Sequence, residues 1–194
     1  MRQERYNRAM LLLLSSVAFA GWTQTAEENG CVYFVGDRQG AYAPVRAECD
    51  WPIAAEKLQK ILADNKSHAA YFGSVIASNV LGPTAGGELV YQAHQASGIS
   101  DREIVLVMGQ APIASGVRYT WERAPDQSKS TGKLVPTVVD TGKWEVTKSA
   151  TGAKVVYELL YDPGGSVPSF LVRSFQGSGT RTLVGELRTW AETH

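Results

Sequence analysis

Apolar and polar residues alternate with a period of two along most of the chain between residues 74 and 161, a pattern typical of strands with one buried face. In the last such run, Val155, Tyr157, Leu159 and Tyr161 share one face. Because short turns separate these runs, neighbouring strands are expected to be antiparallel. The predicted strands lie at 74–81, 88–95, 101–109, 116–123, 134–146 and 153–161.

The first part of the chain predicts a hairpin followed by a helix. Two short strands, at 31–35 and 42–49, are expected around a turn at 37–40. Asp50-Trp51-Pro52 favours a helix start, because an acidic cap residue and a proline both suit the first turn. Helical spacing of apolar residues continues to about Asp64. Residues 21–29 are predicted to be a flexible mature N-terminus.

The hydrophobic period changes from two to 3.6 at Asp162-Pro163-Gly164-Gly165. Ser166 and Pro168 suit the start of a helix that should run to about Trp190 and cover the inner face of the sheet. Two glycines of Gln176-Gly177-Ser178-Gly179 fall inside this helix. They are expected to break it, or to soften it so that it moves and admits a ligand; a local loop without a role is the alternative.

The N-terminal residues have the pattern of an export signal. Arg2, Arg5 and Arg8 form a basic start, an apolar run follows at 9–19, and Ala18-Phe19-Ala20 matches an A-x-A cleavage site. The interpretation is a signal peptide at 1–20, cut after Ala20, and a periplasmic or secreted mature protein. An uncleaved N-terminal anchor is the alternative. Residues 30–194 should then form a single domain, since no linker or repeat divides them.

The chain has two cysteines, Cys31 and Cys49. A hairpin centred near Gly40 places them opposite each other on paired strands, at a spacing suited to a disulfide. The oxidising compartment expected for an exported chain favours this bond. Two free buried thiols are the alternative.

Composition indicates an ordinary globular domain. Hydrophobic residues make up 44% and charged residues 20%, the formal net charge is zero, and no Lys/Arg run occurs, so no nucleic-acid partner is expected. His68, His94 and His194 do not form a metal-binding set, and strand parity puts His94 on the polar face. No catalytic motif stands out and no cofactor is expected.

Four short motifs occur in order along the chain. They are Ser100-Asp101-Arg102-Glu103 before a strand, Gly142-Lys143-Trp144, Val156-Tyr157 followed by the DPGGSVP turn at 162–168, and Leu183 with Leu187-Arg188. Together they resemble START (StAR-related lipid-transfer) domains of the START-like, or SRPBCC, helix-grip superfamily, in a bacterial-type exported form. The resemblance covers about residues 30 to 190. It implies an α+β helix-grip fold, with a curved antiparallel sheet of about seven strands wrapped around a long C-terminal helix and an apolar tunnel between them.

Strand parity and this resemblance together suggest the residues that contact a ligand. Arg102 shares a face with Ile104 and Met108, so its guanidinium must be paired or lie at the rim of the tunnel. It would meet the polar end of a ligand or bond backbone carbonyls at the strand start, and the second role is favoured. Residues 109–116 are the candidate loop at the tunnel mouth. The candidates for the tunnel lining are Tyr91, Met108, Trp121, Tyr157, Leu159 and Phe170, with ordinary core packing as the alternative for each.

The predicted function is that of an exported lipid-binding or lipid-transfer protein, not an enzyme, holding a phospholipid, fatty acid, sterol or similar molecule. Residues 106–109 are apolar where some sterol-binding relatives carry an arginine, which weakens a sterol-specific assignment. The expected partners are a hydrophobic small molecule or lipid and, transiently, a membrane; the protein is expected to be a monomer. The alternatives are an aromatase/cyclase-type enzyme of the same fold and an interaction module whose pocket is filled by side chains.

Overall fold

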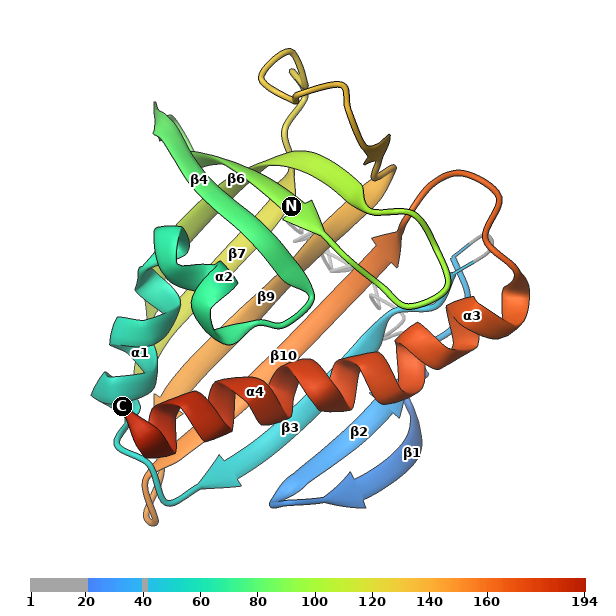
Figure 1. Ribbon diagram of the computed structural model, residues 1–194. Coiled ribbons are helices and arrows are strands. Elements are labelled where there is room, and N and C mark those ends of the chain that lie inside the picture. The colour runs from blue at the N-terminus through green and yellow to red at the C-terminus, as the bar shows by residue number, and fades with distance from the viewer. Residues whose placement is uncertain (1–20, 40–41) are drawn as a thin grey trace, which may run out of the picture.

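The alternating segments pair into one open sheet of ten strands that curves around the C-terminal helix (Figure 1). The computed structural model describes residues 21–39 and 42–194, so the signal peptide predicted at 1–20 lies outside it. The order across the sheet is β1-β2-β3-β10-β9-β7-β6-β5-β4, while β8 lies off this path and pairs with β6. The strands are β1 (Thr23–Glu28), β2 (Cys31–Val35), β3 (Val45–Trp51), β4 (Val75–Thr84), β5 (Gly87–His94), β6 (Arg102–Ile113), β7 (Gly116–Arg123), β8 (Val135–Pro136), β9 (Val139–Lys148) and β10 (Ala153–Asp162).

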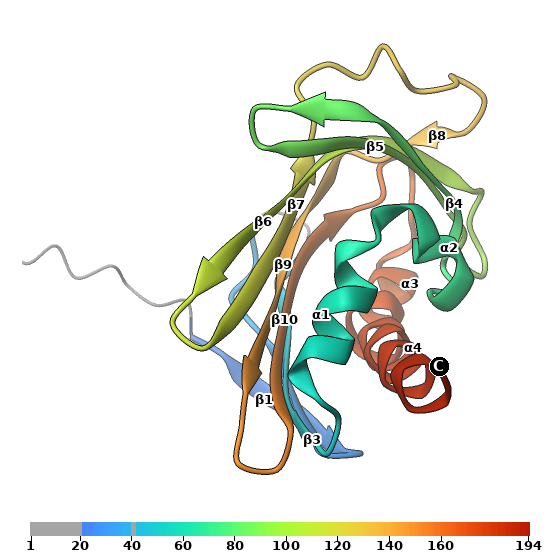
Figure 2. The same cartoon turned by 90° about the vertical axis from the view of Figure 1, so that its left-hand side faces the viewer.

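The helices lie on one side of the sheet, as the edge-on view in Figure 2 shows. Between β3 and β4 the chain forms α1 (Ala55–Ala63), the 3₁₀ turn η1 (Asn65–Ser67) and α2 (His68–Tyr71). The C-terminal helix consists of α3 (Ser169–Ser174), the π-helical turn η2 (Phe175–Gly179) and α4 (Thr180–Thr193). Its buried residues include Val184, Leu187 and Ala191, which join the core of the sheet's inner face. The predicted α+β helix-grip fold is confirmed, with ten strands where about seven were expected.

Strand β1 corrects the prediction that residues 21–29 are flexible. It pairs with β2 from Thr23↔Val35 to Glu28↔Cys31. Asn29 and Gly30 form the turn between these strands with φ of 54° and 73°, the left-handed backbone typical of a tight Asn-Gly hairpin turn. The Asn-Gly dipeptide is the sequence signal for this strand, and it outweighs the weak hydrophobic pattern of Thr23–Glu28.

The first helix begins later than predicted, because strand β3 extends to Trp51. Trp51 pairs with Ala153 of β10 and is almost completely buried. Asp50 does not cap a helix; its carboxylate accepts hydrogen bonds from Ser149 and Thr151, each at 2.8 Å. Pairing with a central strand therefore outweighs the local helix signal, and α1 starts at Ala55.

Cys31 and Cys49 are directly paired residues of β2 and β3, and a disulfide bond joins them. The bond links strands at the end of the sheet farthest from β4. Gly40, on which the hairpin was expected to be centred, lies outside the described residues.

The turn at DPGG is held in place by Arg102. Gly164 and Gly165 both have φ of 68°, which favours glycine, and Oδ1 of Asp162 accepts the Gly164 N–H at 2.9 Å. Arg102, 5% exposed, donates to the carbonyl oxygens of Pro163 (3.2 Å), Gly164 (3.3 Å) and Ser100. Arg102 thus fastens the start of β6 to the joint where the chain leaves β10 for the last helix.

The segment between β7 and β9 covers the outer face of β5 and β6. Gln127 bonds the backbone N–H and C=O of Val105, at 2.9 and 2.8 Å. Glu103 accepts hydrogen bonds from the backbone N–H groups of Thr131 (3.1 Å) and Leu134 (3.3 Å). Burial opposes ionisation of Glu103, but hydrogen bonds outweigh it and lower its pKa to about 2, with the Thr131 hydroxyl contributing most and the Leu134 N–H next. Both faces of this part of the sheet are therefore buried.

The glycines of the last helix do not break it. Residues 175–179 form one π-helical turn, flanked by Ser174 and Thr180 in ordinary helical conformation. The Ser178 hydroxyl donates to the carbonyl of Ser174 at 3.0 Å, and the Gln176 amide donates to the carbonyl of Ala43 at 3.0 Å. The helix is continuous, but it carries its wider turn where the glycines lie. Such turns occur frequently at functional sites.

Candidate ligand-binding site

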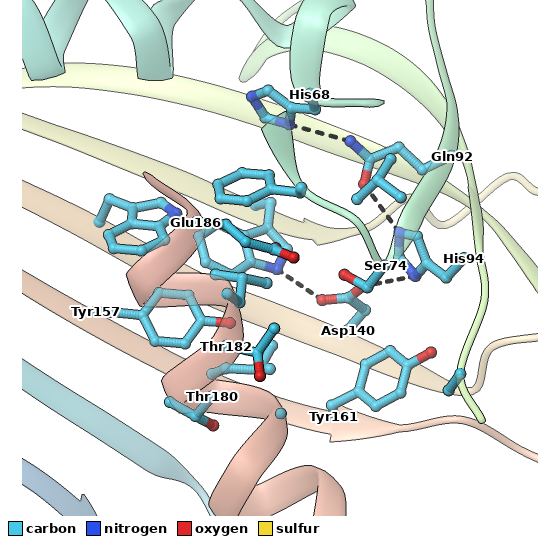
Figure 3. A pocket seen from close by; sticks show the side chains of 18 of the residues that line it. His68, Ser74, Gln92, His94, Asp140, Tyr157, Tyr161, Thr180, Thr182 and Glu186 are labelled. Carbon is cyan, nitrogen blue, oxygen red and sulfur yellow. Dashed lines mark hydrogen bonds and ion pairs between the residues drawn. The ribbon is translucent and has the colours of Figure 1, made fainter. Parts of the chain in front are cut away.

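A cavity of about 490 Å³ lies between the concave face of the sheet and the last helix (Figure 3). Strands β6, β7, β9 and β10 supply one wall. The rest comes from strands β4 and β5, the last helix, the α1–η1–α2 segment, and the loops that flank β4 and β5. Its volume is in the range of small-molecule sites. The apolar lining is Leu62, Phe72, Val75, Met108, Tyr119, Trp121, Trp144, Tyr157, Leu159 and Leu183.

Strand register brings the aromatic residues of the sheet wall together. Tyr119 of β7 pairs with Trp144 of β9, and Trp144 pairs with Tyr157 of β10. The ring centroids of Trp144 and Tyr157 are 4.4 Å apart, and those of Trp121 and Tyr157 are 5.9 Å apart. Because large rings in mutual contact lose little freedom on binding, they provide a preformed apolar wall.

Gly142 provides the space that Trp121 occupies. The two residues are paired across β7 and β9, and a Cβ on Gly142 would overlap both the Trp121 ring and the carbonyl oxygen of Glu158. The glycine therefore lets the indole lie over the neighbouring strand. In this position Nε1 of Trp121 donates a hydrogen bond to Oδ1 of Asp140 at 2.6 Å.

A chain of polar side chains crosses one end of this apolar cavity (Figure 3). Oδ2 of Asp140 lies 3.9 Å from Nδ1 of His94. Nε2 of His94 is 3.0 Å from Oε1 of Gln92, and Nε2 of Gln92 is 3.1 Å from Nδ1 of His68. One polar chain thus joins side chains from β9, β5 and α2, and it ends at the Trp121 indole.

Burial shifts the pKa of each ionisable group in this polar chain toward its uncharged form. Asp140 is 4% exposed, and loss of hydration raises the pKa of its carboxyl to about 7, against the opposing effect of the Trp121 hydrogen bond. Burial lowers the pKa of His94 and of His68 to about 4. At neutral pH both imidazoles are therefore neutral, and Asp140 is near its midpoint.

The lining offers hydrogen bonds but no positive charge. No Lys or Arg contributes to it in the described part of the chain. Glu186 lies on α4, and its carboxylate accepts the backbone N–H of Gly73 at 3.1 Å.

Among residues 21–39 and 42–194, no group of His, Cys, Asp and Glu is arranged to hold a metal ion. Nor does any described helix combine the length and apolar character needed to cross a membrane.

Comparison with solved structures identifies the fold. A StAR-related lipid transfer protein from Xanthomonas axonopodis superposes with a TM-score of 0.78 at 24% identity, over 89% of this chain and 99% of that one. Human StAR-related lipid transfer protein 5 superposes with a TM-score of 0.77 at 14% identity, over 89% of this chain and 87% of that one. The fold is START-like. The Zhui aromatase/cyclase of Streptomyces sp. R1128 is more distant, with a TM-score of 0.56 at 15% identity over 77% and 93%. No protein-family model and no curated protein matches the sequence.

Four of the residues predicted from the sequence meet in the cavity of this START-like fold. Met108, Trp121, Tyr157 and Leu159 all line it. Phe170 was also predicted to line it, but its side chain lies outside what the structure describes.

Tyr91 and Arg102 do not line the cavity. Tyr91 is on the outer face of β5, where its hydroxyl donates to Glu103 at 3.1 Å. Arg102 faces inward but bonds backbone carbonyls at the DPGG turn, the role that was favoured for it. Tyr91 was misassigned because the segment between β7 and β9 covers the outer face of β5, so that the outer face also carries apolar residues.

The polar residues of the cavity were missed. Gln92 and His94 were assigned to the solvent face of their strand, yet Val90, Gln92 and His94 pair with Leu106, Ile104 and Arg102 on the inner face. For Asp140 a signal existed, because it has the same strand parity as Trp144 and Val146, both buried.

The mouth of the cavity is also different from the prediction. Residues 109–116 form the ends of β6 and β7 and the tight hairpin between them, with Ile113 paired to Gly116, and of these residues only Gly109 contributes to the lining. The loop after β5 contributes Gln95, Ala96 and Ser97. A Cβ on Gly98 of this loop would lie 3.4 Å from the Leu171 side chain, so the loop meets the last helix at α3.

Proposed function

We propose that this protein is an exported, non-enzymatic binder or carrier of a hydrophobic small molecule or lipid. The observation that carries the proposal is the 490 Å³ cavity with its aromatic wall beneath the last helix. Two of the structures with this fold are named as lipid transfer proteins. A cavity of this size also argues against an interaction module whose pocket is filled by side chains.

Export is supported by the basic and apolar pattern of residues 1–20 and by the Cys31–Cys49 disulfide. Disulfides persist in the periplasm and outside the cell, and they are rare in the cytosol. We propose that the mature chain begins at Gly21 and works as a monomer, contacting a membrane only while it loads or releases its ligand.

The experiment is to purify the mature protein from the periplasm or medium and identify bound molecules by native mass spectrometry and solvent extraction. Leu183→Trp should fill the cavity from α4 and reduce the bound ligand. Val138→Trp is the matched control, because Val138 is 54% exposed. A folded wild-type protein that neither retains an apolar molecule nor takes up phospholipid, fatty acid or sterol would contradict the proposal.

A cyclase-type enzyme is the second candidate. A carboxyl with its pKa raised to about 7, facing His94 in an apolar cavity, has the properties of a general acid or base. The likeness to an aromatase/cyclase adds support for this fold as an enzyme scaffold. Incubation of the loaded protein distinguishes the two: a carrier returns its ligand unchanged, whereas an enzyme converts it in a way that Asp140→Asn abolishes.

A further inference from the structure

Asp140 and His94 both line the cavity and face each other without a hydrogen bond between them, across a short gap called here the Asp140–His94 gap. Asp140 is 4% exposed, and its Oδ1 accepts the Trp121 N–H. Oδ2 is 3.9 Å from Nδ1 of His94, too far for a hydrogen bond between them. A carboxyl oxygen of the buried Asp140 and an imidazole nitrogen of the partly buried His94 therefore face each other at the cavity wall, each able to take one more partner (Figure 3).

The hydrogen bonds of Gln92 decide which proton His94 carries. The Gln92 amide nitrogen is 3.1 Å from both Nδ1 of His68 and Oγ of Ser78, and the Ser78 hydroxyl donates to the carbonyl of Asn65. Both amide protons are thus committed, so Oε1 of Gln92 must accept a proton from Nε2 of His94. A neutral His94 then has a bare Nδ1, which presents an acceptor to the gap.

We infer that the Asp140–His94 gap is a hydroxyl site, which binds the hydroxyl group of an uncharged apolar alcohol whose hydrocarbon part fills the cavity. This inference rests on the proposed ligand-binding function. A hydroxyl donates its proton to Nδ1 of His94 and accepts the proton of the Asp140 carboxyl. An oxygen about 2.8 Å from both atoms would lie about 2 Å to one side of the line that joins them. Ethers and ketones only accept, so they would leave Nδ1 unpaired.

Charge at the site disfavours anionic ligands. Bringing in a carboxylate or phosphate would bury a negative charge beside Asp140 with no Lys or Arg among the described lining residues to pair with it. An alkylammonium could donate to both Asp140 and His94, but it would take two charges out of water. The alcohol is favoured because it satisfies both atoms without any buried charge, consistent with the raised pKa of Asp140.

The test compares five ligands that share one hydrocarbon chain: the alkane, the primary alcohol, its methyl ether, the carboxylic acid and the primary amine. Binding is followed at about pH 5.5, between the pKa of His94 near 4 and that of Asp140 near 7, by the fluorescence of Trp121 and Trp144, which line the cavity, and by calorimetry. The alcohol should bind roughly five- to tenfold more tightly than the ether, as expected for one hydrogen bond, and more tightly than the acid and the amine.

Two substitutions at Asp140 and one outside the site assign the preference to the hydroxyl site. Asp140→Leu should bind alcohol and ether within about twofold of each other while still binding the alkane. Asp140→Asn should keep the preference, because its amide N–H replaces the carboxyl proton as donor. Tyr91→Phe removes a hydroxyl from the outer face and should leave all five affinities unchanged.

The outcomes separate the two proposals. If no ligand binds the folded wild-type protein, the proposed function fails and the hydroxyl site with it. If the alkane binds but the alcohol has no advantage over the ether, or if the acid or amine binds most tightly, the hydroxyl site alone is refuted. Retention of the alcohol preference in Asp140→Leu would also refute it.

Discussion

The stability of the Asp140→Asn variant should depend on pH differently from that of the wild type. Asp140 normally titrates near 3.8, but burial raises its pKa to about 7 in the folded protein. Between these values the folded state keeps a proton that the unfolded state has lost. Wild-type stability therefore loses a contribution as pH rises from about 4 to 7, and this loss persists above 7. Asparagine has the same shape but no proton to lose.

The size of the effect follows from the shift. Folding raises the pKa of Asp140 from 3.8 to about 7, and each pKa unit corresponds to about 1.36 kcal/mol. Ionisation of the carboxyl therefore lowers the stability of the folded state by about 4 kcal/mol at most. The groups facing Asp140 are His94, Tyr157 and Tyr161; burial keeps both tyrosines neutral throughout this range, and His94 becomes charged only near pH 4. His94 and His68, with pKa values lowered to about 4, give stability that rises with pH up to about 6.5. That contribution is common to both proteins and largely cancels in the difference.

Urea unfolding of both proteins at intervals from pH 4 to 8 measures this difference directly. The variant should be close to wild type at pH 4 and more stable by a few kcal/mol at pH 8, with most of the change below pH 7. A constant difference over the whole range would show that the Asp140 carboxyl titrates at its ordinary pKa, and the inference that it is desolvated would then be wrong. The disulfide must stay oxidised in all samples, since its reduction would change the unfolded reference state.

Three further predictions concern the scaffold. Arg102→Ala should lower the free energy of unfolding by about 3 kcal/mol or more, because it leaves buried carbonyls such as that of Pro163 unpaired, while alkane affinity stays unchanged; a selective loss of ligand binding would contradict this role. Replacing Cys31 and Cys49 together with Ala should cost about 3 kcal/mol in urea unfolding, as expected for a bond across 18 residues, and a loss well below 1 kcal/mol would count against it. Gly177→Ala should stabilise the protein by about 1 kcal/mol, since its Cβ would meet nothing within 4 Å, and should slow ligand exchange in stopped-flow measurements; unchanged exchange would refute gating by the π-helical turn.

Some parts of the fold can be predicted from the sequence because local chemistry decides them. Strand β10 alternates cleanly, and Tyr157 and Leu159 face the cavity as their parity requires. The DPGG turn follows from residues that stop a strand and permit a left-handed backbone. Arg102 could be given its structural role in advance because an inward-facing guanidinium at a strand start needs nearby carbonyl oxygens.

Other parts depend on contacts between distant segments. The two faces of β5 are the clearest case. Tyr91 lies on the face with the more apolar sequence pattern, but that face is the outer one. The inner face, which lines the cavity, carries Gln92 and His94. Residues 124–134 bury the outer face, so alternation alone cannot tell which face is inward. The end of β3 likewise depends on its partner β10 and not on the helix-start signal at Asp50.

The polar residues of the cavity wall are those whose burial is unfavourable for the fold. Asp140, His94 and His68 each have a pKa moved toward the uncharged form, so each lowers the stability of the folded protein at some pH. Apolar residues of similar size would fill the same positions at no such cost. A polar chain in the wall of an apolar cavity, in which Asp140 Oδ2 and His94 Nδ1 lie 3.9 Å apart without a hydrogen bond between them, is best explained by a ligand that bonds both atoms.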